Sequence, residues 1–338
     1  MLDPLARAAR RSVLQSSRLG AIALAALLLA SCGGDDADTP RLFSSAVVFG
    51  ASLTDTGNVC PTAATPGCPP VPPYASGRFS NGTLFVETIA GRYGAAVTPS
   101  TRGGNNFAYA GARTGAIPGL ATQSTTPSMV AQVQQFFDNP AKTSLLNPQT
   151  LFIVDASTFG NNINAGFGSP TAPGPLATGA VTPTAFITAG VTDIVTIMTR
   201  LYNGGARHIL VVNVPNVGDT PLLRATEVAV PGIRANATAL SGGFNQGLAG
   251  AIQANLLPTA PGLRVYTLDF FTLGNQITAN PAAFGLTNAT DACFSVPGGV
   301  PSICTTPDTY LYWDSFHPTR ATGAIAASTA TTPPLPAP

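Results

Sequence analysis

The sequence predicts an α/β protein in which helices flank a central parallel β-sheet. Short apolar runs rich in β-branched residues alternate with longer stretches of helical periodicity along the 338-residue chain. Strands separated by helices are typical of βαβ units, whose strands pair in parallel. A second observation agrees: Ser52 follows the apolar run 46–49 across a glycine, and parallel sheets place functional groups at the carboxyl ends of their strands.

Four apolar runs are the expected strands, and the amphipathic stretches that separate them are the expected helices. The strands are 46–49, 151–154, 208–214 and 263–268, and the helices are 84–93, 129–137, 184–202 and 236–257. A stretch rich in proline, glycine and alanine, 166–183, buries little apolar surface and is expected to be a mobile loop. No fixed-period repeat interrupts this pattern, so we expect one large domain.

The composition argues against a nucleic-acid-binding protein. Hydrophobic residues make up 45% of the chain and charged residues only 9%, and the formal net charge is +1. A nucleic-acid-binding protein carries a basic patch, and this chain has none. We therefore expect no nucleic-acid partner.

The N-terminus reads as a targeting segment. A basic region is followed by the apolar stretch 21–30, which is too short for a bilayer span of roughly 20 residues. It ends in Leu29-Ala30-Ser31-Cys32, which resembles the bacterial lipobox. That resemblance implies a signal peptide over 1–31 and a lipidated Cys32, with Gly33 favouring the outer membrane. The alternative is an ordinary secretory signal that is cleaved elsewhere.

The expected organisation follows from this signal. Residues 32–43 form a lipidated tether, 44–330 the folded domain, and 331–338 a disordered tail. The protein is thus expected to be exported, anchored by lipid to the bacterial cell envelope, and monomeric.

Four cysteines remain after Cys32, and they are expected to form disulfides in an oxidising compartment. Three pairings are possible. The two short local loops make Cys60–Cys68 and Cys293–Cys304 the simplest. No Cys-x-x-Cys occurs and no histidine lies near either pair, so no metal site is expected.

Three residues can form a Ser-His-Asp triad. Ser52 is the candidate nucleophile, His317 the base and Asp314 the acid that orients it. Only one other histidine exists, His208, and it begins an expected strand without a matching acid. The alternatives are structural: Asp314 is a helix cap and His317 precedes a proline that suits the first helical turn.

Three segments in this order resemble sequence blocks of the GDSL, or SGNH, esterase and lipase family. They are the nucleophile turn 47–58, the glycine-flanked amide segment 103–112, and Trp313-Asp314-Ser315-Phe316-His317-Pro318. Segments 77–82, 212–221 and 280–293 are also similar to family stretches. The resemblance implies a flavodoxin-like three-layer α/β/α sandwich, ester hydrolysis through an acyl-Ser52 intermediate, and no cofactor.

The resemblance also implies an oxyanion hole. Its donors would be the Ser52 N–H, the Asn106 side chain and the Gly82 N–H. Asn106 is otherwise a turn asparagine and Gly82 a turn glycine.

Two positions depart from the family pattern. Ala51 replaces the acid before the serine, which weakens the expected support of the turn. The family's Gly-x-Asn-Asp is present only as Gly160-Asn161-Asn162, after a changed approach from Asp155.

We expect a serine esterase or lipase that acts on lipid or short-to-medium acyl esters. Two alternatives stay open: a carbohydrate-ester deacetylase of the same fold, and a lipoprotein that keeps the fold only for binding.

Overall fold

The computed structural model describes residues 42–62, 68–123 and 125–338. The expected signal peptide, Cys32 and nearly all of the tether lie outside the described residues. Within 42–338, four strands form one parallel sheet in the order β1 (Ser45–Phe49), β2 (Thr150–Asp155), β5 (His208–Val212) and β6 (Arg264–Leu268). The predicted parallel sheet is therefore confirmed, strand by strand.

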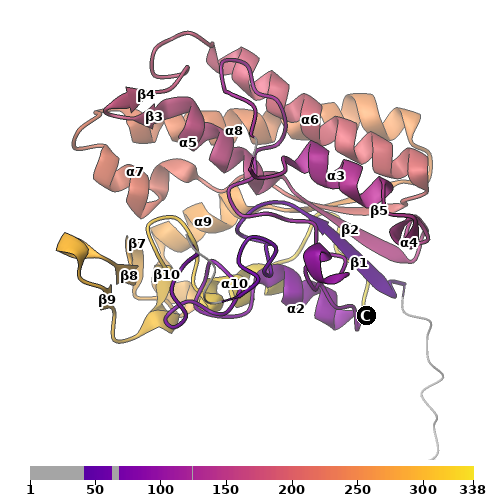
Figure 1. Ribbon diagram of the computed structural model, residues 1–338, viewed down its shortest axis with the longest axis horizontal. Coiled ribbons are helices and arrows are strands. Elements are labelled where there is room, and N and C mark those ends of the chain that lie inside the picture. The colour runs from indigo at the N-terminus through magenta and orange to yellow at the C-terminus, as the bar shows by residue number, and fades with distance from the viewer. Residues whose placement is uncertain (1–41, 63–67, 124) are drawn as a thin grey trace, which may run out of the picture. The chain divides into compact units, whose positions relative to one another are not determined.

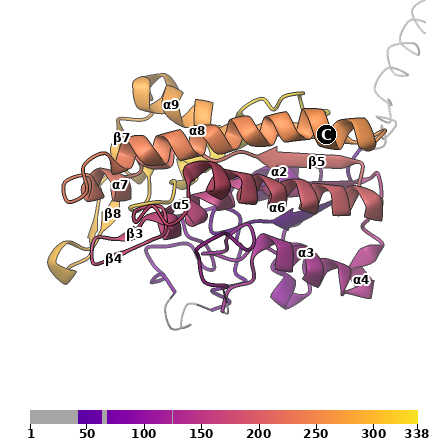
Figure 2. The same cartoon turned by 90° about the horizontal axis from the view of Figure 1, so that it is seen from above.

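Helices cover both faces of this sheet (Figure 1). One face carries α3 (Met129–Phe137), α5 (Phe159–Phe167), α6 (Pro183–Gly204) and α8 (Ile233–Ala251). The other carries α2 (Phe85–Arg92), α9 (Phe270–Ala279) and α10 (Arg320–Ser328). Helices α6 and α8 run side by side, as Figure 2 also shows. This is the three-layer α/β/α arrangement that the resemblance implied.

The inner strands β2 and β5 are buried at every residue and are mostly apolar, because helices cover both of their faces, whereas the edge strand β6 is exposed at Arg264. In β1, Val47 and Phe49 pack into the core under α3 and α6, whereas Val48 packs into the core under α2. Helix α6 is long and apolar enough to cross a membrane, but its buried residues, such as Phe186 and Ile194, pack against this same sheet. Helix α6 is therefore a core helix of this domain.

Some elements differ from those expected. The helix predicted at 236–257 begins at Ile233, and its last part, Ile252–Leu256, is π-helical. The stretch 166–183 contains a short antiparallel pair, β3 (Gly168–Ser169) with β4 (Ala172–Pro173). The short helices α4 (Pro140–Thr143) and α7 (Pro221–Thr226) had no periodic signal.

The expectation of a disordered tail is not met. Thr332 exchanges backbone hydrogen bonds with Thr267 of β6, and the Tyr93 hydroxyl donates to the Pro336 carbonyl at 2.7 Å. Leu335 packs against the core on the α2 side. The physical reason is that β6 is an edge strand, whose unpaired backbone groups bind a passing segment.

Both expected disulfides are confirmed, Cys60–Cys68 and Cys293–Cys304. The second closes a hairpin of β8 (Phe294–Ser295) and β9 (Ser302–Ile303). Nearby, β7 (Asn288–Ala292) pairs in parallel with β10 (Tyr310–Tyr312), so this C-terminal region is tied together covalently and by backbone hydrogen bonds.

A buried carboxylate supports the turn that follows β1. Asp155, the last residue of β2, is fully buried and accepts the Thr54 hydroxyl at 3.0 Å and the Ala51 N–H. The Ser157 N–H and hydroxyl donate to its other oxygen. Burial raises the pKa of Asp155 to about 6, although these donors act in the opposite direction.

Gly50 makes this approach possible. A Cβ at Gly50 would lie 2.7 Å from the Asp155 Cβ and 2.3 Å from the Thr54 hydroxyl, which is too close for any side chain. Gln132 of α3 clamps the same peptide from the other direction, because its amide accepts the Gly50 N–H and donates to the Gly50 carbonyl, each at 2.9 Å. The turn is thus held by a strand and a helix together.

The raised pKa predicts how stability depends on pH. The folded protein holds the Asp155 proton up to about pH 6, whereas the ordinary value is 3.8. The contribution of the Asp155 proton to the free energy of unfolding is therefore fully present below about pH 4. This contribution, of up to about 3 kcal/mol, is lost as pH rises through about 6. Urea unfolding of wild type and Asp155→Asn at several pH values between 4 and 7 measures this difference. Parallel pH dependences in the two proteins would contradict it.

Candidate active site

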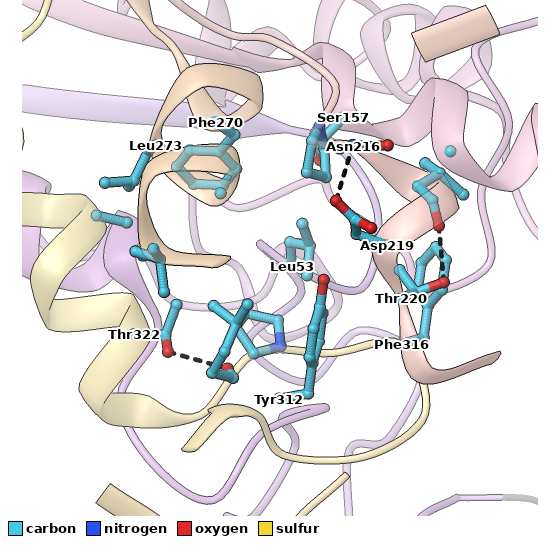
Figure 3. Close-up of a pocket in the computed structure, with 18 of the residues that line it drawn as sticks. Leu53, Ser157, Asn216, Asp219, Thr220, Phe270, Leu273, Tyr312, Phe316 and Thr322 are labelled. Atoms are coloured by element: carbon cyan, nitrogen blue, oxygen red, sulfur yellow. Dashed lines mark hydrogen bonds between the residues drawn. The ribbon is translucent and has the colours of Figure 1, made fainter. Parts of the chain in front are cut away.

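The turn after β1 and the loop after β10 meet at one cavity. Ser52 lines this cavity together with Phe316 and Pro318, the two neighbours of His317. Gly160 and Asn161 of α5 complete the same wall. Figure 3 shows the cavity with Leu53 near its centre and the side chains of several elements around it. Segments far apart in the sequence therefore meet at one cavity.

Asp314 and His317 form a closed loop. The His317 Nδ1 lies 2.8 Å from one Asp314 carboxylate oxygen and 3.0 Å from the other. Asp314 also accepts the N–H groups of Phe316 and His317, and the Trp313 N–H donates to the His317 carbonyl at 2.7 Å. Because Nδ1 faces the carboxylate, Nε2 is the ring nitrogen left for a nucleophile.

Among the described residues, no hydrogen bond joins the Ser52 hydroxyl to His317. Catalytic hydrogen bonds often form only when substrate binds. Phe79 lies close to both residues: its ring centroid is 5.4 Å from that of His317, and Phe79 and Ser52 line the same second, small cavity. Ser52 itself is 6% exposed, at the wall of both cavities.

Tyr74 is a member of this site that the sequence did not reveal. Its hydroxyl donates to Asp314 at 2.8 Å, and its ring packs edge-on against Trp313 and Phe294. Burial and the charge of Asp314 raise the pKa of Tyr74, so its hydroxyl stays a donor. Tyr74 lies in a proline-rich stretch without periodicity, and only the fold places it near Asp314.

The charge of Asp314 is set by opposing effects. Burial tends to raise its pKa, but the neighbouring His317 and the two backbone N–H donors outweigh burial and hold the pKa below its ordinary value. Asp314 is therefore a carboxylate at neutral pH, suited to orient an imidazole and stabilise its protonated form.

The expectation for Asn106 is not met. Its side chain is fully buried, and its amide nitrogen donates to the Thr54 carbonyl at 2.6 Å and to the Thr56 hydroxyl at 2.9 Å. Its amide oxygen accepts the Ala108 N–H. Both amide hydrogens are thus used inside the protein, and Asn106 clamps the turn instead of facing the cavity.

Gly82 also has a different place from the one expected. It lines neither of the cavities that contain Ser52. A Cβ there would lie 2.7 Å from the Arg320 side chain, and the Arg320 N–H donates to Asn81. Gly82 therefore makes room for the start of α10.

Two side-chain amides, Asn161 and Asn216, line the cavity that contains Ser52, and the amide nitrogen of Asn216 already donates to Asp219 and Asn275. Asn161 lies in the first turn of α5, and its amide nitrogen donates to the Ala112 carbonyl at 2.8 Å, which leaves the second amide hydrogen available. The next residue, Asn162, is fully buried, and both atoms of its side-chain amide bond to Thr114. The altered Gly160-Asn161-Asn162 segment was the sequence signal for this residue.

His208, the other histidine, is remote from this chemistry. It begins β5, at the amino ends of the strands, and its Nδ1 lies 2.9 Å from the Tyr266 hydroxyl. It is buried, and burial lowers its pKa. The residues that the structure describes include no cluster of side chains that could hold a metal ion.

Comparison with known proteins places this geometry in a family. Residues 47–329 match the family described as GDSL-like Lipase/Acylhydrolase. A GDSL esterase/lipase of Arabidopsis thaliana is 25% identical over 312 residues, which cover 83% of this chain and 84% of the relative. A second is 26% identical over 319 residues, covering 82% and 86%, and a third is 33% identical over 141 residues, covering 38% and 39%. The matched residues include the turn around Ser52, the Asp314–His317 loop, most of β1 and the other three strands of the sheet, and the chain belongs to the GDSL-like lipase/acylhydrolase family.

Proposed function

We propose that this chain hydrolyses carboxylic esters with Ser52 as nucleophile, His317 as base and Asp314 as the orienting acid. Family membership supports ester hydrolysis. The observation that carries the residue roles is the Asp314–His317 pair, held in one loop whose neighbouring side chains line the same cavity as Ser52.

The reaction follows from this arrangement. His317 Nε2 takes the Ser52 hydroxyl proton as the serine oxygen attacks the ester carbonyl, and Asp314 stabilises the imidazolium. Collapse of the tetrahedral intermediate breaks the bond to the alcohol, which leaves with the proton from His317. Water then loses a proton to His317 and hydrolyses the acyl-Ser52 ester. Tyr74 fixes the carboxylate so that its lone pairs stay aimed at Nδ1.

We infer that the oxyanion is bound by the Ser52 N–H and the Asn161 side chain. A neutral amide donor is suited to the developing charge. Asn161 replaces Asn106 in this role because its amide reaches the cavity wall, whereas the hydrogens of Asn106 are already donated to the turn.

The triad is tested with a panel of p-nitrophenyl esters, a phospholipid and acetylated sugars. Ser52→Ala and His317→Ala should each lower kcat by at least about 1,000-fold, because the acyl-enzyme route is lost. His208→Ala is the matched histidine control and should retain turnover. Labelling by a fluorophosphonate at a residue other than Ser52 would overturn the assignment.

The oxyanion donor is tested by a pair of asparagine substitutions. Asn161→Ala should lower kcat by about 100- to 1,000-fold with little change in KM or in the unfolding midpoint, since it removes a donor used in the transition state. Asn106→Ala should instead lower the free energy of unfolding, because it leaves buried partners of the amide unpaired. The reverse pattern, with full stability and lost turnover at Asn106→Ala alone, would show that Asn106 is the donor.

We further propose that Cys32 carries a lipid anchor. The two disulfides indicate an exported protein, and Leu29-Ala30-Ser31-Cys32 has the lipobox pattern. The anchor would then hold the enzyme at a membrane surface, where lipid esters are present.

The anchor predicts a change of location. In a Gram-negative host, Cys32→Ser should move the protein from the membrane fraction to the soluble fraction and abolish labelling by radioactive palmitate. Ser31→Ala is the matched neighbour control and should stay in the membrane fraction. Membrane retention of Cys32→Ser would count against the anchor.

A further inference from the structure

The cavity beside Ser52 extends between three helices. Its wall includes Phe85 of α2, several residues of α9 and several of α10. Figure 3 shows Phe270, Leu273 and Thr322 on one side of Leu53, and Asp219, Thr220 and Phe316 on the other. We call the first side the helical slot; it is lined by Phe85, Phe270, Leu273, Gly274, Ile277, Thr278, Thr322, Gly323 and Ala326.

The helical slot offers a substrate no free charge. Its members are apolar or small except for two threonines, and the Thr322 hydroxyl donates to the Leu311 carbonyl at 2.9 Å. The acidic group on the opposite side, Asp219, is neutralised by ion pairs with Arg224 and Arg234 at 2.9 and 2.8 Å. A hydrocarbon chain is the kind of group that gains from such a surface, through the removal of its methylenes from water.

Small residues keep the helical slot open. Gly274 lies in the middle of α9, and a Cβ added there would meet no atom within 4 Å. Gly323 and Ala326 of α10 also line the slot. Glycine in a helix interior costs about 1 kcal/mol relative to alanine, so Gly274 needs a reason other than helix stability. We infer that this reason is the open space beside its Cα, which a larger side chain would fill.

We propose that the helical slot binds the acyl chain of the ester, and that Gly274 sets the chain length it accepts. The proposal rests on ester hydrolysis at Ser52 and adds the substrate class: esters of hydrophobic acids with a chain longer than that of acetate. The carbonyl carbon would lie at Ser52 and the chain would run between α9 and α10, away from the paired Asp219.

The test is a chain-length series of p-nitrophenyl esters, from acetate through butyrate and octanoate to dodecanoate. In wild type, kcat/KM should rise with length by up to about fourfold per methylene until the slot is full. Gly274→Leu and Gly274→Phe should lower kcat/KM for octanoate by at least about tenfold and change that for acetate less than about threefold. Gly274→Ala should keep most of the octanoate activity.

Gly250→Phe is the matched control for adding bulk to a helix. Gly250 lies exposed in α8, a Cβ there also meets nothing within 4 Å, and it does not line the cavity. Its length profile should equal that of wild type. Circular dichroism of each variant shows that the fold is intact, and Gly274→Leu serves if Gly274→Phe does not fold.

The outcomes separate this inference from the function on which it rests. A wild type that hydrolyses none of the esters would remove the proposed function. A wild type that hydrolyses esters, with the same length profile in Gly274→Leu as in wild type, would overturn the helical slot alone. A shift seen only in a parallel series of alkyl acetates would show that the slot holds the alcohol chain, which overturns the acyl assignment.

Discussion

The carboxylate of Asp155 is the group on which the geometry of the site depends. It comes from the end of β2, reaches under the neighbouring strand, and accepts hydrogen bonds from Ala51 and Thr54 on either side of Ser52. In the family pattern an acid stands directly before the serine, where this chain has Ala51. A neighbour in the sheet thus supplies the support that a neighbour in sequence would otherwise provide. The register of β1 on β2 therefore fixes the position of Ser52.

Around this carboxylate the polar groups form a connected frame. Asp55 accepts four backbone N–H groups, from Gly57, Asn58, Val59 and Ala110, and burial still raises its pKa. Asn58 and Asn106 then bond the nucleophile turn to the segment 105–108. With only 9% charged residues, the chain uses buried amides and carboxylates where other proteins use ion pairs. A network of buried polar groups is rigid when its members have hydrogen-bond partners, as Asp55, Asn58 and Asn106 do here.

Much of this fold could be predicted from the sequence because its strands are short runs rich in β-branched residues and its longest helices span many turns. Helices α5, α9 and α10, of nine or ten residues each, were not predicted, and neither was the ordered tail, which is held by an edge strand. In the site, the local motifs predicted Ser52, Asp314 and His317 as one constellation. The motifs did not predict which way each side chain points. Asn106 and Asn161 both lie in suitable motifs, but only the structure shows that Asn106 donates its amide hydrogens to the turn. Tyr74 had no local signal at all, because its role depends on a contact between distant segments.

The aromatic packing of Trp313 has a consequence for spectroscopy. Trp313 is the only tryptophan in the chain, stands directly before Asp314, and stacks on Phe294 at a centroid distance of 5.7 Å while Tyr74 meets it edge-on. Its indole N–H is buried and has no hydrogen-bond partner among the residues that the structure describes, so its emission should be blue-shifted in the folded protein. All tryptophan fluorescence of this protein thus originates one residue from the acid of the site. Emission excited beyond the tyrosine absorption band therefore becomes an intrinsic reporter of how the loop that contains Asp314 is packed.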